Sequence, residues 1–226
     1  MNGTSVGRRR FLSAAALSGL GGLAGCLGSG GVSDAGKRDV SSNPVASSLD
    51  GRPRLGPARS ETDITLVTFD DPSCPSCASY HGGTFGEIES KWVESGKATV
   101  YNRLYPYVAP WGRTAIHALV ALNRRRPEQF WSLKSKYYAN QDRLSADNIV
   151  EETRRFLRDT DVDADAVARA AENGANESYV STEVSDGDDA GLYGVPLTYL
   201  FEDGEFVTTI MTESFGTFSS AVESHG

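Results

Sequence analysis

A pair of cysteines separated by two residues is the feature that most constrains the fold of this chain. Cys74 and Cys77 are two of only three cysteines in 226 residues, and they lie where the apolar run 64–69 gives way to a helical pattern. At the start of a helix, unpaired N–H groups and the helix dipole stabilise a thiolate, which is the reactive form of cysteine. This position predicts a redox site with Cys74 as the nucleophile.

The spacing of the pair gives each thiol a different role. Cys77 lies about one turn further along the predicted helix, close enough to form a disulfide with Cys74 but turned toward the interior. Pro75 suits the first helical turn, because it lacks an N–H that would have no partner there and its φ is already helical. We therefore expect Cys77 to be the resolving thiol.

The segments on either side of the cysteines predict a βαβ unit. Residues 64–69 and 98–105 are rich in β-branched and aromatic residues, which favours strands, and the segment between them has apolar residues at helical spacing. We expect this helix to bend or break at Gly82 and Gly83, because glycine lowers helix stability. A helix between two strands predicts that the strands are parallel.

The second half of the chain divides into a helical segment and a hairpin. Residues 109–190 have a helical pattern, with Ser145 and Asp163 as expected N-caps, and we interpret them as a helical insertion. Residues 197–211 then predict a β-hairpin with a short glycine turn, followed by a terminal helix. Pro196 leads into this hairpin, and on sequence alone the simplest interpretation is a trans loop proline at a strand entry.

The first 60 residues are predicted to lie outside the folded domain. Residues 1–26 have a basic start, a weakly apolar middle and small residues before Cys26, which are the parts of an export signal. The apolar middle is too short and too rich in glycine to span a bilayer securely. Residues 27–60 carry few large apolar side chains and predict a flexible Gly/Ser/Pro-rich tether. The domain is then expected over residues 61–226.

The charge balance argues against a nucleic-acid partner. The chain has 30 acidic and 22 basic residues, which gives a net charge of -8. Removal of residues 1–25, which contain three arginines and no acidic residue, would change the net charge to -11. A surface this acidic repels nucleic acid, so we expect other partners.

The order of these elements resembles that of the DsbA-like disulfide oxidoreductases of the thioredoxin superfamily. The resemblance covers residues 62–226 and is carried by the Cys-Pro-Ser-Cys motif at 74–77, the helical insertion and the later Val195-Pro196 pair. It implies an α/β thioredoxin-like fold, with a central mixed β-sheet flanked by helices. In that family the proline is cis and faces the cysteines, so the resemblance reverses the expectation of a trans Pro196.

The resemblance also implies an activity, protein thiol-disulfide exchange, with no cofactor and no metal. A substrate thiolate would attack the disulfide between the two cysteines and form a mixed disulfide at Cys74, and the reverse reaction uses the same atoms. Export favours an oxidase or isomerase over a reductase, because disulfides persist outside the cytosol. The expected catalytic residues are Cys74, Cys77 and Pro196, and the expected substrate-binding residues are Val195, Pro75 and Ser76.

The N-terminal segment resembles a twin-arginine lipoprotein signal. Residues 8–12 (Arg-Arg-Arg-Phe-Leu) look like the twin-arginine motif, and residues 23–26 (Leu-Ala-Gly-Cys) look like a lipobox. This implies export in a folded state and a lipid anchor on Cys26 at the extracytoplasmic face of the cell membrane. The expected partners are cysteine-containing exported proteins, an unidentified redox recycling partner and the membrane.

Two positions depart from the family pattern. Many members carry a carboxylate six residues before the first cysteine to move protons for the buried thiol, whereas this chain has Thr68 there, so Asp70, Asp71 or water would have to serve. Strong oxidases often carry a histidine between the cysteines, whereas Ser76 offers only a hydroxyl. Because the two aspartates also oppose a thiolate on Cys74, the sequence does not predict a very low pKa for that thiol.

Two other functions are compatible with the sequence. Cys74 and Cys77 could bind zinc or copper together with His81 and His117, although a structural zinc site usually has a second Cys or His pair. Alternatively, the two cysteines could form a structural disulfide in a protein-binding domain. Outside a metal site, each histidine is expected to be a partly buried helix residue.

Overall fold

The computed structural model describes residues 43–46, 48–211 and 214–225, all within the unit Gly36–Gly226. The predicted export signal and residues 27–42 of the predicted tether lie outside the described residues. Within the described part of the chain, no helix combines the length and apolar character that a membrane crossing requires.

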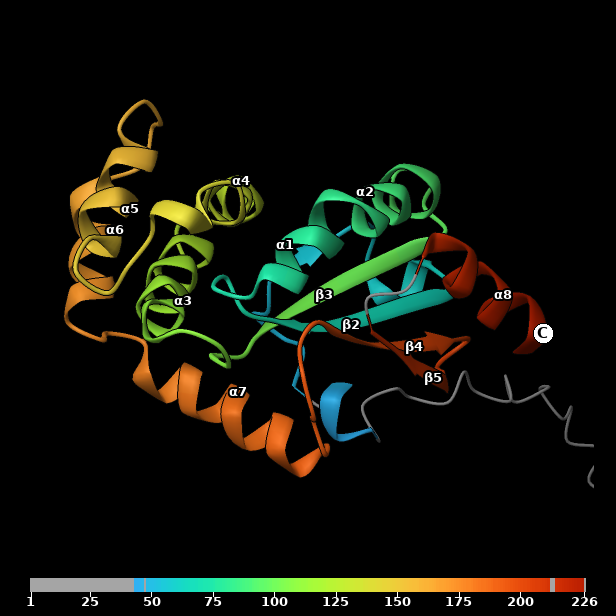
Figure 1. Cartoon of the computed structure of the whole chain (residues 1–226). Helices are drawn as coiled ribbons and strands as arrows, with labels where there is room; N and C mark the ends of the chain where they lie inside the picture. The colour runs from blue at the N-terminus through green and yellow to red at the C-terminus, as the bar shows by residue number, and fades with distance from the viewer. Residues whose placement is uncertain (1–42, 47, 212–213, 226) are drawn as a thin grey trace, which may run out of the picture. The chain divides into compact units, whose positions relative to one another are not determined.

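A mixed β-sheet forms the centre of the described unit, with the strand order β1-β3-β2-β4-β5 (Figure 1). The strands are β1 (Arg54–Leu55), β2 (Ile64–Asp70), β3 (Ala98–Leu104), β4 (Leu197–Glu202) and β5 (Glu205–Ile210). β2 and β3 are parallel, and the other neighbouring pairs are antiparallel. The predicted strands, their parallel pairing and the hairpin are confirmed.

Helices cover both faces of this sheet. The α-helices are α1 (Pro75–Gly82), α2 (Thr84–Ile88), α3 (Pro110–Asn123), α4 (Pro127–Tyr138), α5 (Ile149–Leu157), α6 (Ala164–Glu172), α7 (Glu177–Asp189) and α8 (Phe215–His225). Alternate residues of β2 face two different cores. Leu66 packs in the core beneath α1, α2 and α8, whereas Val67 and Phe69 pack in the core on the side of α7. β2 is buried throughout, which explains its continuous apolar pattern.

The helix after the cysteines is interrupted where the sequence predicts it. Gly83 has φ -118° and ψ -98°, outside the helical region, and it separates α1 from α2. A π-helical turn, Glu89–Val93, then completes the connection to β3. The predicted break is therefore confirmed.

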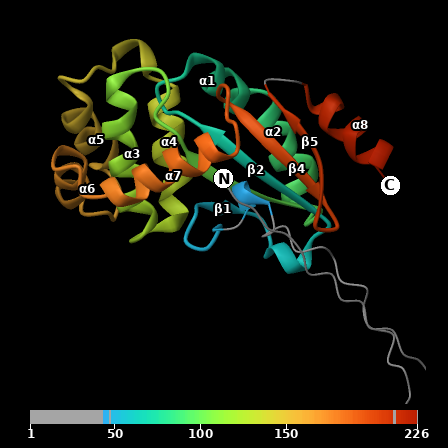
Figure 2. The same cartoon turned by 90° about the horizontal axis from the view of Figure 1, so that it is seen from below.

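The predicted helical insertion between β3 and β4 is confirmed, and α3 to α6 group beside the sheet around a core of their own (Figures 1 and 2). Asp163 caps α6 as predicted, because its Oδ1 accepts a hydrogen bond from the N–H of Ala166 at 2.9 Å. The prediction for Ser145 is wrong. Its own N–H donates to Asn148 Oδ1 at 2.8 Å, so a turn closes first and α5 begins at Ile149.

The tether prediction is wrong for residues 43–46 and 48–60, which together we call the N-terminal strap. Val45, Ala46 and Leu49 are buried against the core on the side of α7, and β1 pairs with β3 at the edge of the sheet. The low content of large apolar side chains was misleading here. A few apolar residues and backbone hydrogen bonds are enough to hold a short segment against an existing sheet. The folded domain therefore begins before the predicted residue 61.

A buried ion-pair network joins the strap, the sheet and α7. Arg103 on β3 is fully buried, and its Nε and Nη2 donate to the two carboxylate oxygens of Glu183 on α7 at 2.8 and 3.2 Å. Arg103 Nη1 also donates to the carbonyl of Val45 at 3.0 Å, and Arg52 Nε lies 2.5 Å from Glu183 Oε1. Arg103 Nη2 also pairs with Asp186, so Glu183 shares the compensation of Arg103 with Asp186 and lies between the Arg103 and Arg52 guanidinium groups.

This network predicts a large stability effect at one glutamate of α7. Glu183→Gln leaves the buried Arg103 without its bidentate partner, so we expect the free energy of unfolding to fall by about 3 kcal/mol. The matched control Glu177→Gln removes an exposed pair with Arg113 from the same helix and should cost less than about 1 kcal/mol. Chemical denaturation followed by tryptophan fluorescence measures both values, and equal losses would contradict the assignment.

Candidate active site

Cys74 lies where β2 ends and α1 begins. It is the N-cap residue of α1, with φ -86° and ψ 120°, and its Sγ accepts a hydrogen bond from the N–H of Cys77 at 3.4 Å. Pro75 follows in the first helical turn, as predicted. The helix start thus points N–H groups at the sulfur of Cys74, which stabilises its ionised form.

The two thiols differ in burial and in acidity. Both are free thiols in this structure, with Cys74 4% exposed and Cys77 0% exposed, and the predicted inward position of Cys77 is confirmed. A hydrogen bond from the Cys77 thiol, with smaller contributions from the N–H groups of Cys77 and Ser76, lowers the pKa of Cys74 to about 7 although burial opposes this. Burial, the hydrogen bond to Cys74 and the charge of Asp70 raise the pKa of Cys77 far above its ordinary value.

A cis proline faces this cysteine pair. The Val195-Pro196 peptide bond is cis, which confirms the expectation drawn from the family resemblance. The protonated thiol of Cys74 lies 3.5 Å from the carbonyl oxygen of Val195, as a hydrogen-bond donor. Segments 121 positions apart in the sequence therefore meet at the sulfur.

The carboxylate of Asp71 holds the turn before Cys74. Asp71 is fully buried, and its Oδ1 accepts hydrogen bonds from the N–H and Oγ of Ser73, both at 2.8 Å. Its Oδ2 accepts from the N–H groups of Tyr107 and Val108, both at 2.7 Å, in the loop after β3. The carboxylate of Asp71 therefore joins the turn that carries Cys74 to the loop after β3.

Gln141 holds the same turn from the side of the helical insertion, and sequence reasoning missed it. Its Nε2 donates to the carbonyl oxygens of Pro72 at 2.8 Å and Cys74 at 3.0 Å. Gln141 lies in a 3-10 turn, Gln141–Arg143, between α4 and α5. Its role depends on a contact across 67 positions, so no local sequence signal marks it.

A buried acid–base pair lies near the resolving thiol. Asp70 Oδ2 accepts hydrogen bonds from Lys134 Nζ at 2.5 Å and from Asn102 Nδ2 at 2.8 Å. Burial raises the pKa of Asp70 although the charge of Lys134 opposes this, and Asp70 in turn raises the pKa of Cys77. The role of Lys134 was not predicted from the sequence. Lys134 lies at helical spacing from Phe130 and Tyr137 on α4, and a lysine on an otherwise apolar helix face could have indicated a buried charge.

Thr68, at the position where many members of the resembled family have a carboxylate, has no acidic function here. Its Oγ1 lies 2.9 Å from Thr198 Oγ1, across the β2–β4 pair. The hydroxyl of Tyr80 lies 3.4 Å from the same Thr198 oxygen. Neutral hydroxyl groups therefore surround position 68. The buried carboxylate near Cys77 is that of Asp70, two residues later in the chain.

The two histidines are not joined with the cysteines into a metal site. His81 Nε2 lies 2.9 Å from Ser135 Oγ, and burial lowers the His81 pKa to about 3. His117 Nδ1 accepts from the N–H of Asn176, near the start of α7. Over residues 43–46, 48–211 and 214–225, no group of three or more His, Cys, Asp or Glu side chains is arranged to hold a metal ion. The metal-binding alternative therefore has no ligand set in this part of the chain.

An exposed apolar patch adjoins the cis-proline loop and the loop held by Asp71. Tyr107, Val108 and Tyr193 are 53%, 52% and 65% exposed, and Tyr107 Oη donates to the carbonyl of Tyr193 at 3.4 Å. Tyr193 precedes the cis bond by two residues. This patch has no local signal in the sequence, because it is assembled from two loops distant in the chain.

Comparison with known proteins gives a family match and one curated relative. The family model described as Thioredoxin matches residues 55–221. Disulfide bond formation protein D of Bacillus subtilis (strain 168) is 26% identical over 94 residues, which are 42% of this chain. That alignment spans 41% of the length of the relative.

Solved structures with similar folds cover more of the chain. Oxidised BdbD from Bacillus subtilis has a TM-score of 0.69 at 17% identity and covers 78% of this chain and 94% of its own. DsbA from Chlamydia trachomatis has a TM-score of 0.65 at 14% identity, with 77% and 91% covered. The catalytic domain of Proteus mirabilis ScsC has a TM-score of 0.61 at 16% identity, with 80% and 96% covered. The predicted α/β thioredoxin-like fold is confirmed.

The unequal acidity of the thiols predicts a single ionisation near neutral pH. In the reduced protein, thiolate absorbance at 240 nm should rise with a midpoint near pH 7, and Cys74→Ser should abolish this step. The pKa of Cys74 in the folded protein lies below its ordinary value of 9.0. Ionisation of Cys74 therefore stabilises the folded, reduced protein as the pH rises from about 7 to 9. This added stability is lost as the pH falls through 7. A step near pH 9 would contradict the assignment.

Proposed function

Since the chain belongs to the thioredoxin family, whose model covers residues 55–221, we propose that it is a thiol-disulfide oxidoreductase of the DsbA type. The observation that carries the proposal is the position of Cys74, a thiol of lowered pKa that faces the carbonyl before a cis proline while Cys77 is buried behind it. The name of the partial relative, Disulfide bond formation protein D, agrees with this activity.

The proposed reaction begins with the disulfide form of the pair. A substrate thiolate attacks Cys74 Sγ, the Cys74–Cys77 bond breaks, and Cys77 leaves and takes up a proton. A second substrate thiolate then attacks the substrate sulfur of the mixed disulfide and releases Cys74 as a thiolate. Two substrate thiols are oxidised and the cysteine pair is reduced by two electrons, so an external oxidant must restore the disulfide.

The acidity of Cys74 favours the oxidising direction. A thiol with a pKa near 7 is a better leaving group than an ordinary cysteine, and its stabilised thiolate makes the reduced form of the pair more favourable. This supports an oxidase or isomerase over a reductase. The opposing charge of Asp71 raises the pKa of Cys74 and so moderates the oxidising strength.

We place substrate binding at the cis-proline loop. Val195 would pair with the backbone of an extended substrate segment, because its carbonyl already lies beside Cys74. Pro75 and Ser76 are exposed next to the reactive sulfur and would contact the same segment. The patch of Tyr107, Val108 and Tyr193 offers apolar contacts to side chains near the substrate cysteine.

We propose Asp70 as the proton carrier for Cys77, in place of a carboxylate at position 68. Asp70 is buried, its pKa is raised, and its charge already affects Cys77. When Cys77 leaves the disulfide, protonated Asp70 donates a proton to it; when Cys77 attacks a mixed disulfide, ionised Asp70 accepts that proton. Lys134 lies 2.5 Å from the carboxylate and stabilises the ionised state.

The N-terminal motifs support a proposal about location. We propose that residues 1–26 direct export through the twin-arginine route and that Cys26 is lipidated, so that the enzyme is tethered at the extracytoplasmic face of the membrane. The tether is then the segment after Cys26 and before the strap. Cysteine-containing exported proteins and a redox recycling partner are the proposed partners.

The trapped intermediate tests the proposed function directly. Cys77→Ala removes the resolving thiol, so covalent adducts with substrate proteins should accumulate at Cys74 and should be released by dithiothreitol. Non-reducing electrophoresis of cells producing this variant detects the adducts, and Cys74→Ala is the matched control that should show none. Absence of adducts at Cys74, with about one metal ion bound per chain, would favour the metal-binding alternative instead.

The role of Asp70 predicts slower exchange in a variant that keeps the side-chain shape. Asp70→Asn should slow substrate oxidation at least tenfold and flatten the dependence of the rate on pH, because the proton acceptor is gone. Asp147→Asn, an exposed change in the insertion, is the control. Asp70→Asn leaves Lys134 buried without its charged partner, so the double variant Asp70→Asn/Lys134→Met is also measured, because it removes both charges. An unchanged rate of substrate oxidation in either variant would refute Asp70 as the proton carrier.

A further inference from the structure

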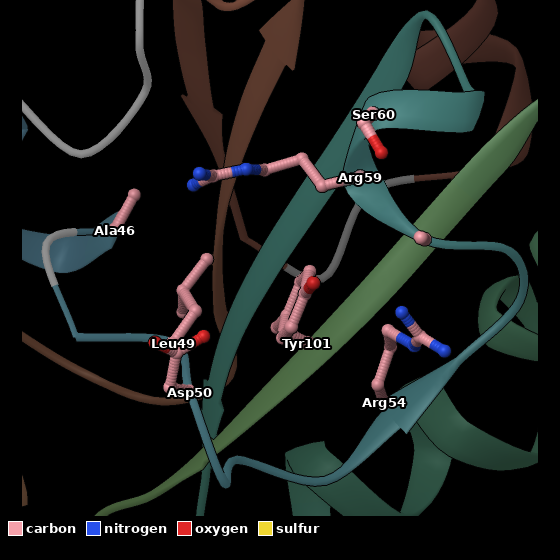
Figure 3. A pocket seen from close by; sticks show the side chains of 8 residues that line it. Ala46, Leu49, Asp50, Arg54, Arg59, Ser60 and Tyr101 are labelled. Atoms are coloured by element: carbon pink, nitrogen blue, oxygen red, sulfur yellow. The ribbon is translucent and has the colours of Figure 1, made fainter.

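Polar side chains converge beside the resolving thiol, whereas they do not converge at the pocket next to the N-terminal strap. That pocket has a volume of about 320 Å³ and lies between the strap and Tyr101 of β3. In Figure 3 the guanidinium groups of Arg54 and Arg59 lie on opposite sides of Tyr101, so one ligand would not meet both. The group with an unassigned function lies instead near Asp70.

Two buried oxygen atoms beside the Asp70–Lys134 pair have no hydrogen-bond partner among the described residues. They are Oδ1 of Asp70 and the hydroxyl oxygen of Tyr138, and both residues are buried. Buried polar groups normally have a partner, because no bulk water is present to replace the lost hydrogen bond. The exchange reaction proposed above does not use the hydroxyl of Tyr138.

Tyr138 lies where α4 faces α1. It follows Lys134 by one helical turn, and Lys134 Nζ lies 5.6 Å from the centre of its ring. The ring centres of Tyr138 and His81 are 5.1 Å apart, and Tyr138 packs in the same apolar cluster as the two cysteines. Tyr138 is therefore a neighbour of both the Asp70–Lys134 pair and the cysteine pair.

The electrostatic environment of Tyr138 also indicates that its hydroxyl lies near Asp70. Burial, followed by the charges of Asp70, Cys77 and Asp71, raises the pKa of Tyr138 well above its ordinary value. A hydrogen-bonding contribution from Asp70 adds to this, although the hydroxyl and the carboxylate are not in standard hydrogen-bond geometry. A phenol with a raised pKa keeps its proton, so Tyr138 acts as a hydrogen-bonding group and not as an acid.

The two carboxylate oxygens of Asp70 have different surroundings. Oδ2 accepts hydrogen bonds from Lys134 and Asn102, whereas Oδ1 has no partner. A proton on Oδ2 would face two donor groups, so a protonated Asp70 carries its proton on Oδ1. The hydroxyl of Tyr138 can rotate, and it can donate to an ionised Oδ1 or accept from a protonated one.

We propose that Tyr138 is a positioning residue for proton transfer at Asp70 Oδ1, where its hydroxyl donates a hydrogen bond whenever Asp70 is ionised. This inference rests on the proposed role of Asp70 as the proton carrier for Cys77. When Cys77 leaves the disulfide, Oδ1 gives its proton to the Cys77 sulfur, and the Tyr138 O–H turns to the carboxylate that remains. When Cys77 attacks the mixed disulfide at Cys74, its proton passes to Oδ1, the bond between Cys74 and the substrate sulfur breaks, and the substrate leaves as a thiolate.

The other groups near the Asp70–Lys134 pair are retained when only the Tyr138 hydroxyl is removed. Besides Lys134 and Tyr138 of α4, the titratable or charged groups there are Asp71, which follows Asp70, and Cys77, Tyr80 and His81 of α1. β3 contributes the neutral side chain of Asn102. A change in pH dependence on removal of the hydroxyl therefore reports on the contact between Tyr138 and Asp70.

The variant Tyr138→Phe in the full chain tests this contact, because it keeps the ring and removes the hydroxyl. The reduced protein is mixed with oxidised glutathione, and the release of the second glutathione by Cys77 is followed at a series of pH values. Loss of the donor raises the pKa of Asp70, so the rise of the rate with pH should move upward by about one unit. At a given pH on this rise, the rate should fall about tenfold.

Tyr137→Phe is the matched control. It removes a buried hydroxyl from the next residue of α4, and that hydroxyl lies 2.6 Å from Thr153 Oγ1 within the insertion core. This change should leave the pH profile in place. Titration of the Asp70 carboxyl carbon by NMR in the reduced protein gives a readout that does not depend on turnover, and Tyr138→Phe should raise the pKa of that carboxyl. Site-specific 3,5-difluorotyrosine at position 138 is a stronger donor and should lower it.

The remaining outcomes separate the role of Tyr138 from the exchange activity. An unmoved profile and an unmoved Asp70 titration in Tyr138→Phe, together with slow exchange in Asp70→Asn, would overturn the role of Tyr138 and leave Asp70 as the proton carrier. Equal changes in Tyr138→Phe and Tyr137→Phe would show a general packing effect and would also overturn it. Failure of the exchange activity itself is seen separately, as absence of Cys74 adducts in Cys77→Ala.

Discussion

The buried carboxylate of Asp71 is the group on which the geometry of the site depends. It binds the Ser73 backbone before the reactive cysteine and the backbone of Tyr107 and Val108 beyond β3, so the helix start and the adjoining loop have one fixed spacing. The same negative charge opposes the thiolate of Cys74. Asp71 therefore fixes the position of Cys74 while raising the pKa of its thiol. The hydrogen bond from the Cys77 thiol, with smaller contributions from the N–H groups at the start of α1, outweighs this effect and lowers the pKa.

The helical insertion takes part in the site as well as adding to its surroundings. Lys134 of α4 compensates the charge of Asp70, and Gln141, just after α4, donates to the carbonyl oxygen of Cys74. Both side chains depend on the packing of the insertion core beside the sheet. A change within that core would therefore reach the two cysteines through these polar contacts, and Tyr138 of α4 packs in the same core cluster as both cysteines.

Residue preferences over a few positions predicted those elements whose structure depends on neighbouring residues in the chain. The strand before Cys74, the helix start at Pro75 and the break at Gly83 follow from residue preferences over a few positions, and the cis bond at Pro196 followed from the family resemblance. Contacts between distant segments were not predictable in this way. The burial of Val45 in the strap and the pairing of Lys134 with Asp70 each depend on a partner that the fold brings close. The delayed start of α5 is different, because there a local turn between Ser145 and Asn148 replaced the expected N-cap.

The full burial of Cys77 has a consequence for how long a partner protein stays attached. Its raised pKa keeps this thiol protonated for nearly all of the time, and a protonated thiol does not attack a disulfide. In the proposed reaction, a partner joined to Cys74 would therefore not be expelled as soon as it is captured. The dwell time of that covalent complex would give a slowly folding partner an opportunity to bring its second cysteine to the bond, which is the encounter that completes a new disulfide.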